Sequence, residues 1–142
     1  MGNKFILNGE KSKFEFEVVG YEFDKSSNKH DSDWLMIRIN VKDHNKKFEI
    51  IKPILLSQDL IYLKEWILMI KKRKVGFKDS IEFMEPDLKF NFIGMKGKRY
   101  FFEIYLQYKK TNLSFRVFGD ELILENIISY LDAKIKKYPK RT

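Results

Sequence analysis

Two histidines, His30 and His44, are the side chains of this sequence best suited to act as general bases near neutral pH. Both lie in polar stretches typical of loops, and neither has a serine at the spacing of a known catalytic motif. The chain has no cysteine, which excludes disulfides, thiolate metal sites and cysteine nucleophiles. We therefore expect no catalytic residue, no metal site and no cofactor.

Two carboxylate pairs, Asp31 with Asp33 and Glu85 with Asp87, have a spacing that could bind a cation or transfer a proton. Each pair lies among turn-forming residues, where a solvated turn is the commoner explanation. The seven glycines form no phosphate-binding loop, and no Gly-x-Ser-x-Gly nucleophile elbow occurs. These absences favour a protein that binds another macromolecule over an enzyme.

The charge of the chain is positive and unevenly distributed. The net charge is +8, yet residues 1–33 hold five Lys/Arg against seven Asp/Glu, whereas residues 34–80 hold eleven against five. The densest basic run is Lys71-Lys72-Arg73-Lys74. Such a run favours nucleic acid or an acidic protein as partner. A composition rich in Lys, Ile, Asn and Phe, as an AT-rich genome produces, explains the lysines equally well.

Length and composition indicate one folded domain over residues 1–142. Hydrophobic residues make up 44% of the chain and aromatic residues 15%, which is too apolar for a disordered protein. No apolar run approaches the roughly 20 residues needed to span a membrane, and the N-terminus lacks the apolar segment of a secretory signal. We therefore expect a cytoplasmic protein without a membrane partner.

Alternation of apolar and polar residues predicts strands over most of the chain. The first runs over 14–23, another over 34–41, and a third over 48–56, where Pro53 indicates an edge strand or a bulge. Residues 24–33 contain no apolar side chain and predict an exposed loop. Further strands are predicted at 81–84, 88–93, 99–108 and 113–118. The connections between several of them are short, which favours antiparallel pairing.

Helical spacing of apolar residues occurs twice. A helix is predicted over 58–73, with the basic run at its C-terminal end, where cations suit the helix dipole. A second helix is predicted over 120–137, with Pro139 after its end. We expect the first helix to bury Leu63, Trp66, Ile67 and Ile70.

Together these elements predict an α+β fold, a mainly antiparallel sheet of about eight strands with two helices packed on it. Residues 33–72 and 99–137 each run strand, turn, strand and helix, and each ends in a basic tail. The chain is either two copies of a four-strand-plus-helix unit or a fold that reuses a common motif, and the low identity between the halves leaves both open.

Aromatic residues are more simply explained as core than as a ligand platform. The segment Lys98-Arg99-Tyr100-Phe101-Phe102 has some likeness to an RNA-binding aromatic strand, but it lacks the glycines of that motif. Its aromatic residues also alternate as core residues do. Trp34 and Trp66 are expected to anchor the core.

Three segments together resemble the WapI family of bacterial immunity proteins. The first is Asp31-Ser32-Asp33-Trp34-Leu35, which opens a strand after the polar loop. The second is Leu55-Leu56-Ser57-Gln58-Asp59-Leu60, followed by Leu63-Lys64-Glu65-Trp66-Ile67. The third is the stretch from Ile81 to Phe90, with Glu-Pro at its corner. The resemblance covers most of the chain from about Asp31 onward and rests on largely structural motifs.

The resemblance implies a small cytoplasmic protein that binds and blocks a cognate contact-dependent toxin, typically a tRNA-cleaving nuclease domain. A nuclease surface must attract phosphates, so an acidic inhibitory face is expected. The net charge of +8 departs from this expectation, and only a local acidic patch would meet it. The acidic residues of the first third, which include Glu22 and Asp24, supply such a patch. We expect the toxin-binding residues to be Glu15, Glu17, Asp31 and Asp33.

The alternative function is direct binding of RNA or DNA. Lys71, Lys72, Arg73 and Lys74 would then contact phosphates, together with the basic run 134–137.

Overall fold

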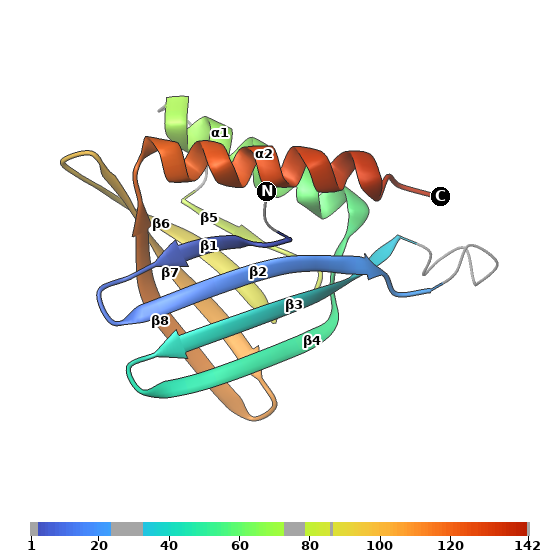
Figure 1. Ribbon diagram of the computed structural model, residues 1–142, viewed down its shortest axis with the longest axis horizontal. Coiled ribbons are helices and arrows are strands. Elements are labelled where there is room, and N and C mark those ends of the chain that lie inside the picture. Colours follow the sequence, from blue (N-terminus) through green and yellow to red (C-terminus); the bar gives the residue numbers. More distant parts are fainter. Residues whose placement is uncertain (1–2, 24–32, 73–78, 86, 142) are drawn as a thin grey trace.

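The computed structural model of the chain describes residues 3–23, 33–72, 79–85 and 87–141. This part of the chain forms eight strands, all paired antiparallel in one sheet, and two helices (Figure 1). The predicted α+β fold is therefore confirmed.

The chain runs through the same sequence of elements twice. In the N-terminal half these are β1 (Phe5–Asn8), β2 (Ser12–Tyr21), β3 (Trp34–Asp43), β4 (Lys46–Leu56) and α1 (Ser57–Lys72). In the C-terminal half they are β5 (Ser80–Glu82), β6 (Leu88–Lys96), β7 (Arg99–Tyr108), β8 (Thr111–Gly119) and α2 (Glu121–Lys137). Each half is thus four consecutive strands followed by a helix.

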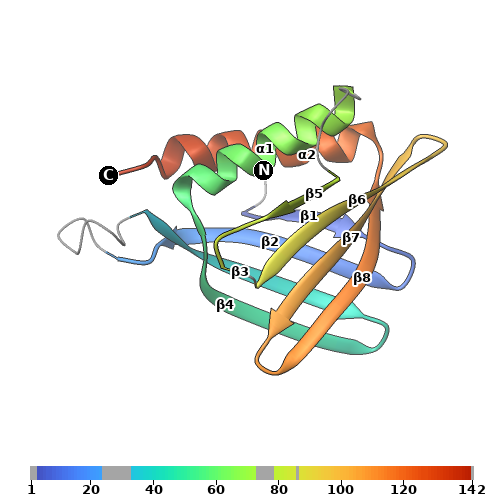
Figure 2. The same cartoon turned by 180° about the vertical axis from the view of Figure 1, so that it is seen from behind.

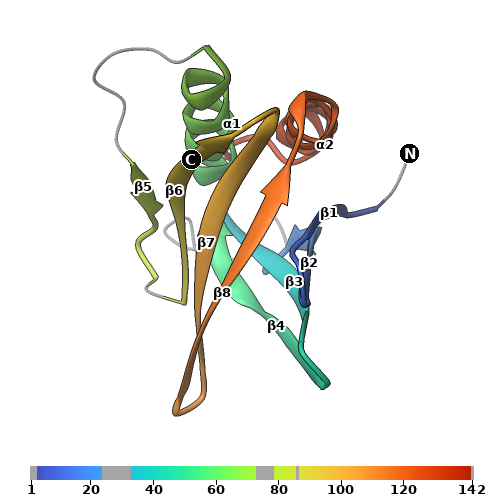
Figure 3. The same cartoon turned by 90° about the vertical axis from the view of Figure 1, so that its left-hand side faces the viewer.

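The strand order β4-β3-β2-β1-β8-β7-β6-β5 joins the two halves through their inner strands. The junction between β1 and β8 has a single pair of Cα partners, Asn8 and Phe118, whereas strands within a half are paired along much of their length. The strands of the two halves run in different directions (Figure 1), and from behind β5–β8 lie in front of β1–β4 (Figure 2). Figure 3 shows the two groups on either side, with α1 and α2 together above them.

The inner faces of the two halves share one core. Phe14 of β2 lies with its ring centroid 5.8 Å from Phe90 of β6 and 6.1 Å from Phe115 of β8. Trp66 of α1 lies 5.9 Å from Phe102 of β7, ring to ring. Because aromatic residues bury large apolar areas and pack well in tilted arrangements, these contacts bind the halves into one unit.

The two helices run antiparallel and are joined by ion pairs. The ammonium of Lys64 lies 2.6 Å from the carboxylate of Asp132, and that of Lys71 lies 3.4 Å from the carboxylate of Glu125. The apolar stripe of α1 faces the core, as predicted. Its buried side chains include Leu63, Trp66, Ile67 and Ile70.

Two hydrogen bonds and one close backbone approach at a glycine link the two halves. Lys52 of β4 donates a 2.9 Å hydrogen bond to the buried carboxylate of Asp87, just before β6. The hydroxyl of Tyr130 on α2 accepts from the backbone N–H of Val18 at 2.9 Å, and burial raises the pKa of this tyrosine to about 12. A Cβ on Gly9 would lie 2.1 Å from the carbonyl oxygen of Arg116, so only glycine fits there.

The structure differs from the sequence prediction at a few places. Strand β1 was not predicted as an element, and the strand predicted over 88–93 is longer in the structure because β6 continues to Lys96. Asp33 was expected in an exposed loop, but it is only 5% exposed. Pro53 lies on β4, which is an edge strand, so that prediction is confirmed.

Candidate binding surface

The described residues contain no cluster suited to metal binding. No group of three or more His, Cys, Asp or Glu side chains is close enough there to hold a metal ion. His44 lies in the turn between β3 and β4, where its Nδ1 is 3.1 Å from a carboxylate oxygen of Asp43. His30 and Asp31 lie outside the described residues. Asp87 is buried and bonded to Lys52, which explains it as a structural residue.

No helix among the described residues is long and apolar enough to cross a membrane.

The outer side of the N-terminal half is a sheet face that no helix covers (Figures 1 and 3). Alternation along β2, β3 and β4 sends one set of side chains into the core and the other outward. We call the outward set the N-face. Strand register arranges it as three bands across the strands. A lysine row holds Lys13, Lys42 and Lys47, and a middle band holds Glu15, Glu17, Arg38, Asn40 and Glu49. An apolar band holds Val19, Met36, Ile51 and Pro53; of these, Met36 and Pro53 are register partners, whereas Ile51 is the partner of Arg38 and adjoins the middle band.

The middle band contains two of the predicted toxin-binding residues, and both have cationic partners. The carboxylate of Glu17 lies 2.9 Å from the guanidinium of Arg38. The carboxylate of Glu15 lies 3.2 Å from the ammonium of Lys4 and 3.3 Å from that of Lys13. Burial alone would raise the pKa of Glu15, but the hydrogen bonds and charges of the two lysines outweigh burial and lower the pKa. The negative charges of this band are therefore largely compensated.

The lysine row crosses three neighbouring strands at one level. Lys13 is the register partner of Lys42, and Lys42 is the register partner of Lys47. Like charges directly opposite one another destabilise a sheet. Lys13 is compensated by Glu15, but no ion pair links Lys42 or Lys47 to any residue that the structure describes. A hollow of about 410 Å³ lies here, lined by side chains that include all three lysines.

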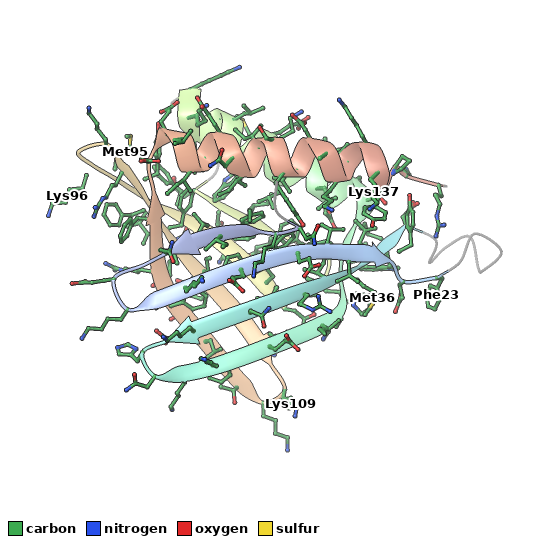
Figure 4. The ribbon with its side chains drawn as sticks, viewed as in Figure 1. Phe23, Met36, Met95, Lys96, Lys109 and Lys137 are labelled. Carbon is green, nitrogen blue, oxygen red and sulfur yellow. The ribbon has the colours of Figure 1, made fainter. Side chains whose placement is uncertain are left out.

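The apolar band lies at the other end of the same strands. Val19 is 43% exposed and Ile51 is 46% exposed, so both present their side chains to solvent. Met36 and Pro53 are register partners on β3 and β4. Figure 4 places Met36 near Phe23 at this end of the molecule, and Phe23 is itself 40% exposed. Exposed apolar side chains gathered in this way are typical of a protein-binding surface.

Asp33, another predicted toxin-binding residue, does not join the N-face. Its carboxylate accepts a 2.6 Å hydrogen bond from the backbone N–H of Arg141. Its backbone carbonyl accepts from the N–H of Ser57, the first residue of α1, at 2.9 Å. The Arg141 guanidinium lies 3.6 Å from the ring centroid of Tyr21 and donates to the carbonyl of Phe23 at 2.8 Å. The C-terminal segment is thereby held against the ends of β2 and β3.

The basic run at the end of α1 is only partly described. Lys71 is 16% exposed and forms ion pairs with Glu121 and Glu125 of α2, so its charge serves the contact between the helices. Lys72 is exposed at the end of α1. Arg73 and Lys74 lie outside the described residues.

A second basic surface lies where β7 and β8 meet the turn after β1. The guanidinium of Arg99 lies 4.5 Å from the ring centroid of Phe118, and the rings of Phe118 and Phe101 are 5.5 Å apart. We call this stack and its hollow of about 800 Å³ the junction groove; Lys96, Lys98 and Glu10 also line it. Figure 4 shows Lys96 at the tip of the β6–β7 hairpin. Sequence reasoning noticed this segment but assigned its aromatic residues to the core, which holds for Tyr100 and Phe102 and not for half-exposed Phe101.

Sequence reasoning found Glu15 and Glu17 but missed the lysine row and the apolar band. Alternation along β2, β3 and β4 was the available signal, because it places Lys13, Lys42 and Lys47 on the side opposite the core. Their meeting in one row depends on strand register, which the sequence does not state.

Comparisons with known proteins give one family and a fold. The family described as "Immunity protein WapI-like family" matches residues 5–139. No curated protein matches the chain. The structure titled "Structure of the plant transcriptional regulator PBF-2" is similar with a TM-score of 0.55 and 16% identity, over 95% of this chain and 81% of that chain. WHY3 from Arabidopsis thaliana is similar with a TM-score of 0.54 and 14% identity, over 97% of this chain and 89% of that chain. At such identities the two structures are similar in fold.

Proposed function

This chain belongs to the WapI-like immunity protein family, as its sequence motifs indicated, and from that premise we propose that it binds a cognate toxin domain and neutralises it. The complex is proposed to be one-to-one, and the protein to act in the bacterial cytoplasm without catalysis. A nuclease is the toxin class that the family resemblance favours.

The single observation that carries this proposal is the extent of the family match. Residues 5–139 include both halves and all ten helices and strands of the described structure. The match therefore concerns the whole fold rather than one motif within it.

The N-face is the surface that best supports binding of a protein. Its exposed apolar side chains would supply the buried centre of an interface, and its charged bands would supply the polar rim. Lys13 and Val19 are six positions apart on β2, since 19 − 13 = 6, which corresponds to about 20 Å of extended chain. An interface of ordinary size, about 800 Å² on each partner, would cover both ends.

Co-expression tests the proposal directly. The toxin domain to use is the variable C-terminal domain of a large open reading frame directly upstream of this gene. We expect cells that express this domain to survive when the protein is co-expressed and to stop growing when it is not. Equal toxicity in both cases would contradict the proposal.

Two double variants then test whether the N-face is used. Val19→Asp with Ile51→Asp places charges in the apolar band, and we expect protection to be lost because those charges would be buried in the complex. Ile61→Asp with Tyr62→Asp is the matched control, since these side chains are 39% and 55% exposed on α1. Full protection by the Val19→Asp/Ile51→Asp variant, or loss of protection in the control alone, would move the interface away from the N-face.

A second function, binding of single-stranded nucleic acid, is favoured by the junction groove. Aromatic faces that stack on bases and cations that contact phosphates are the features such binding needs. Fluorescence anisotropy with a short single-stranded RNA at low salt measures it, and Phe101→Ala with Arg99→Ala should abolish micromolar binding. The variant Lys72→Ala serves as control for the basic run of α1. A flat titration with the unaltered protein would remove this candidate.

A further inference from the structure

The lysine row of the N-face is a charged surface whose counter-charge is missing from the described structure. Lys42 lies between two lysines in register, and only Lys13 has an acidic partner. Cross-strand repulsion of this kind destabilises the sheet. The repulsion between these lysines therefore destabilises the free protein. A partner that brings negative charge would reduce it.

The rest of the N-face indicates which sign of charge a partner must carry. Glu15 and Glu17 are held by Lys4, Lys13 and Arg38 at 2.9–3.3 Å, so they are already neutralised. The uncompensated charges at this end of the N-face are the exposed ammonium groups of Lys42 and Lys47 and the one exposed carboxylate of Glu49, so positive charge is in excess. A basic surface would therefore be repelled at this end of the N-face, whereas an acidic one would be attracted.

A second hollow continues the row at the strand ends, beside the β1–β2 and β3–β4 turns. It has a volume of about 530 Å³ and shares Lys13 and Lys42 with the first. Lys11 and His44 also line it, while Glu10 is the acidic residue there. Several basic side chains thus face two adjoining hollows, which gives a partner's carboxylates room to enter between them.

We propose that the toxin docks on the N-face with an acidic patch of its own surface, whose carboxylates lie against Lys13, Lys42 and Lys47. This inference rests on the proposed immunity function and deepens it. It also reverses the expectation that the inhibitor imitates RNA with an acidic face. The toxin is held at a carboxylate-bearing surface, and its phosphate-attracting surface does not meet the lysine row.

A nucleic acid would also be attracted to the lysine row, but the N-face favours a protein. The members of the apolar band, Val19, Met36, Ile51 and Pro53, are not aromatic, and Phe23 beside Met36 is a single exposed ring, whereas a nucleic acid strand stacks successive bases on several rings. Aliphatic side chains of this kind instead pack against apolar side chains of a protein partner. One protein interface uses both ends of the N-face, whereas a nucleic acid strand would use only the lysine row.

The double variant Lys42→Glu with Lys47→Glu tests the proposal. The double variant gives Lys13 an unlike charge opposite it and leaves like charges opposite each other only at positions 42 and 47, so one repulsive pair replaces two and we expect it to fold at least as stably as the unaltered protein. The matched control is Lys110→Glu with Lys136→Glu, two exposed lysines on the β7–β8 turn and on α2. Each Lys→Glu substitution lowers the net charge by two units, so both double variants fall equally, by 2 × 2 = 4 units from +8.

Association with the purified toxin domain is measured by stopped-flow or surface plasmon resonance at low and high salt. At low salt we expect the association rate constant of the Lys42→Glu/Lys47→Glu variant to fall about tenfold or more below that of the control variant. At high salt the difference should shrink, because salt screens exposed charges. The same proteins are titrated with a single-stranded RNA as a second measurement.

Three outcomes would overturn the inference. If the unaltered protein does not bind the toxin domain, the proposed function fails and the inference fails with it. If the unaltered protein binds and the two double variants associate equally fast, the inference alone is wrong and the immunity function stands. If the Lys42→Glu/Lys47→Glu variant loses RNA binding but not toxin binding, the lysine row serves a nucleic acid instead.

Discussion

The two halves of the molecule share one order of elements but carry different outer faces. The N-face shows aliphatic side chains, compensated carboxylates and a lysine row. The outer face of the C-terminal half shows aromatic side chains, among them Phe101, Phe118 and Tyr105, with cations above the rings of Phe118 and Tyr105. The inner faces, in contrast, are uniformly apolar and meet in one core. The shared core requires the same alternation in both halves, while solvent leaves each outer face free to acquire its own binding chemistry.

The two helices also begin differently. Asp120 stands before α2 and its carboxylate accepts from the N–H of Ile123 at 3.0 Å, in the manner of an exposed N-cap. Asp59 lies within the first turn of α1, is buried, and accepts backward from the N–H of Leu56 at 2.8 Å. Each helix start thus uses one carboxylate but at a different position, since Asp120 precedes α2 whereas Asp59 is the third residue of α1.

The largest expected effect would show whether the halves are one unit. Phe14→Ala removes a fully buried ring that contacts both β6 and β8, and we expect a loss of about 3–5 kcal/mol in the free energy of unfolding. Urea denaturation should remain a single transition, with circular dichroism and tryptophan fluorescence coincident. Two separate transitions would mean that the halves are independent.

The junction between the halves is tested by Gly9→Ala. The new methyl group would meet the backbone of Arg116, and we expect a loss of about 2–3 kcal/mol in the free energy of unfolding. Gly20→Ala is the matched control, because the nearest atom to its Cβ is 3.9 Å away. Similar melting temperatures for both variants would show that the close approach of β1 to β8 is not required.

The exposed cap of α2 gives a smaller effect. Asp120→Ala removes the acceptor for the N–H of Ile123, and we expect a loss of about 1 kcal/mol in the free energy of unfolding. Asp120→Asn keeps an acceptor and should change stability little. If both variants lose the same stability in thermal melts, the contribution is one of charge rather than of capping.

Substitution of Asp59, the buried carboxylate of α1, is expected to change the free energy of unfolding least, by an amount that depends on pH. Burial raises the pKa of Asp59, and the hydrogen bond from Leu56 opposes this only in part. The native state therefore binds the proton more tightly than the unfolded chain. Binding of this proton stabilises the native state. The stabilisation is fully present below the ordinary pKa of 3.8 and is lost as the pH rises through the raised pKa of Asp59.

Asp59→Asn removes that titration and keeps an acceptor for the N–H of Leu56. Relative to the unaltered protein, we expect the variant to gain stability at neutral pH and to show no such gain near pH 3. Urea titrations at both pH values measure the difference. A gain of equal size at both pH values would rule out the protonation of Asp59 as its source.

Alternation and helical spacing predicted most of the fold because they act over short stretches of chain. Helix α1 and its buried residues followed from the spacing of Leu63, Trp66, Ile67 and Ile70. Strand β1 was missed because four residues, of which three are apolar, do not establish a period.

The candidate surface was predictable only in part because its contacts are distant along the chain. Alternation placed Glu15 and Glu17 outward, as the structure has them. The burial of Asp33 depends on Arg141, which is 108 residues away. The lysine row likewise joins three strands through their register. Contacts between residues so far apart in the sequence depend on tertiary packing, and no local sequence pattern predicts them.

The edges of the eight-stranded sheet have a consequence for how any partner can approach. One edge is β5, of only three residues, and the other is β4, which carries Lys46, Lys47 and Pro53. A short edge offers little template for an added strand, and lysine and proline along a longer edge discourage one. The protein is thus guarded against edge-to-edge polymerisation, and a peptide cannot easily be recruited by strand addition. Recognition has to read side chains on a face, where single substitutions change specificity while the backbone stays as it is.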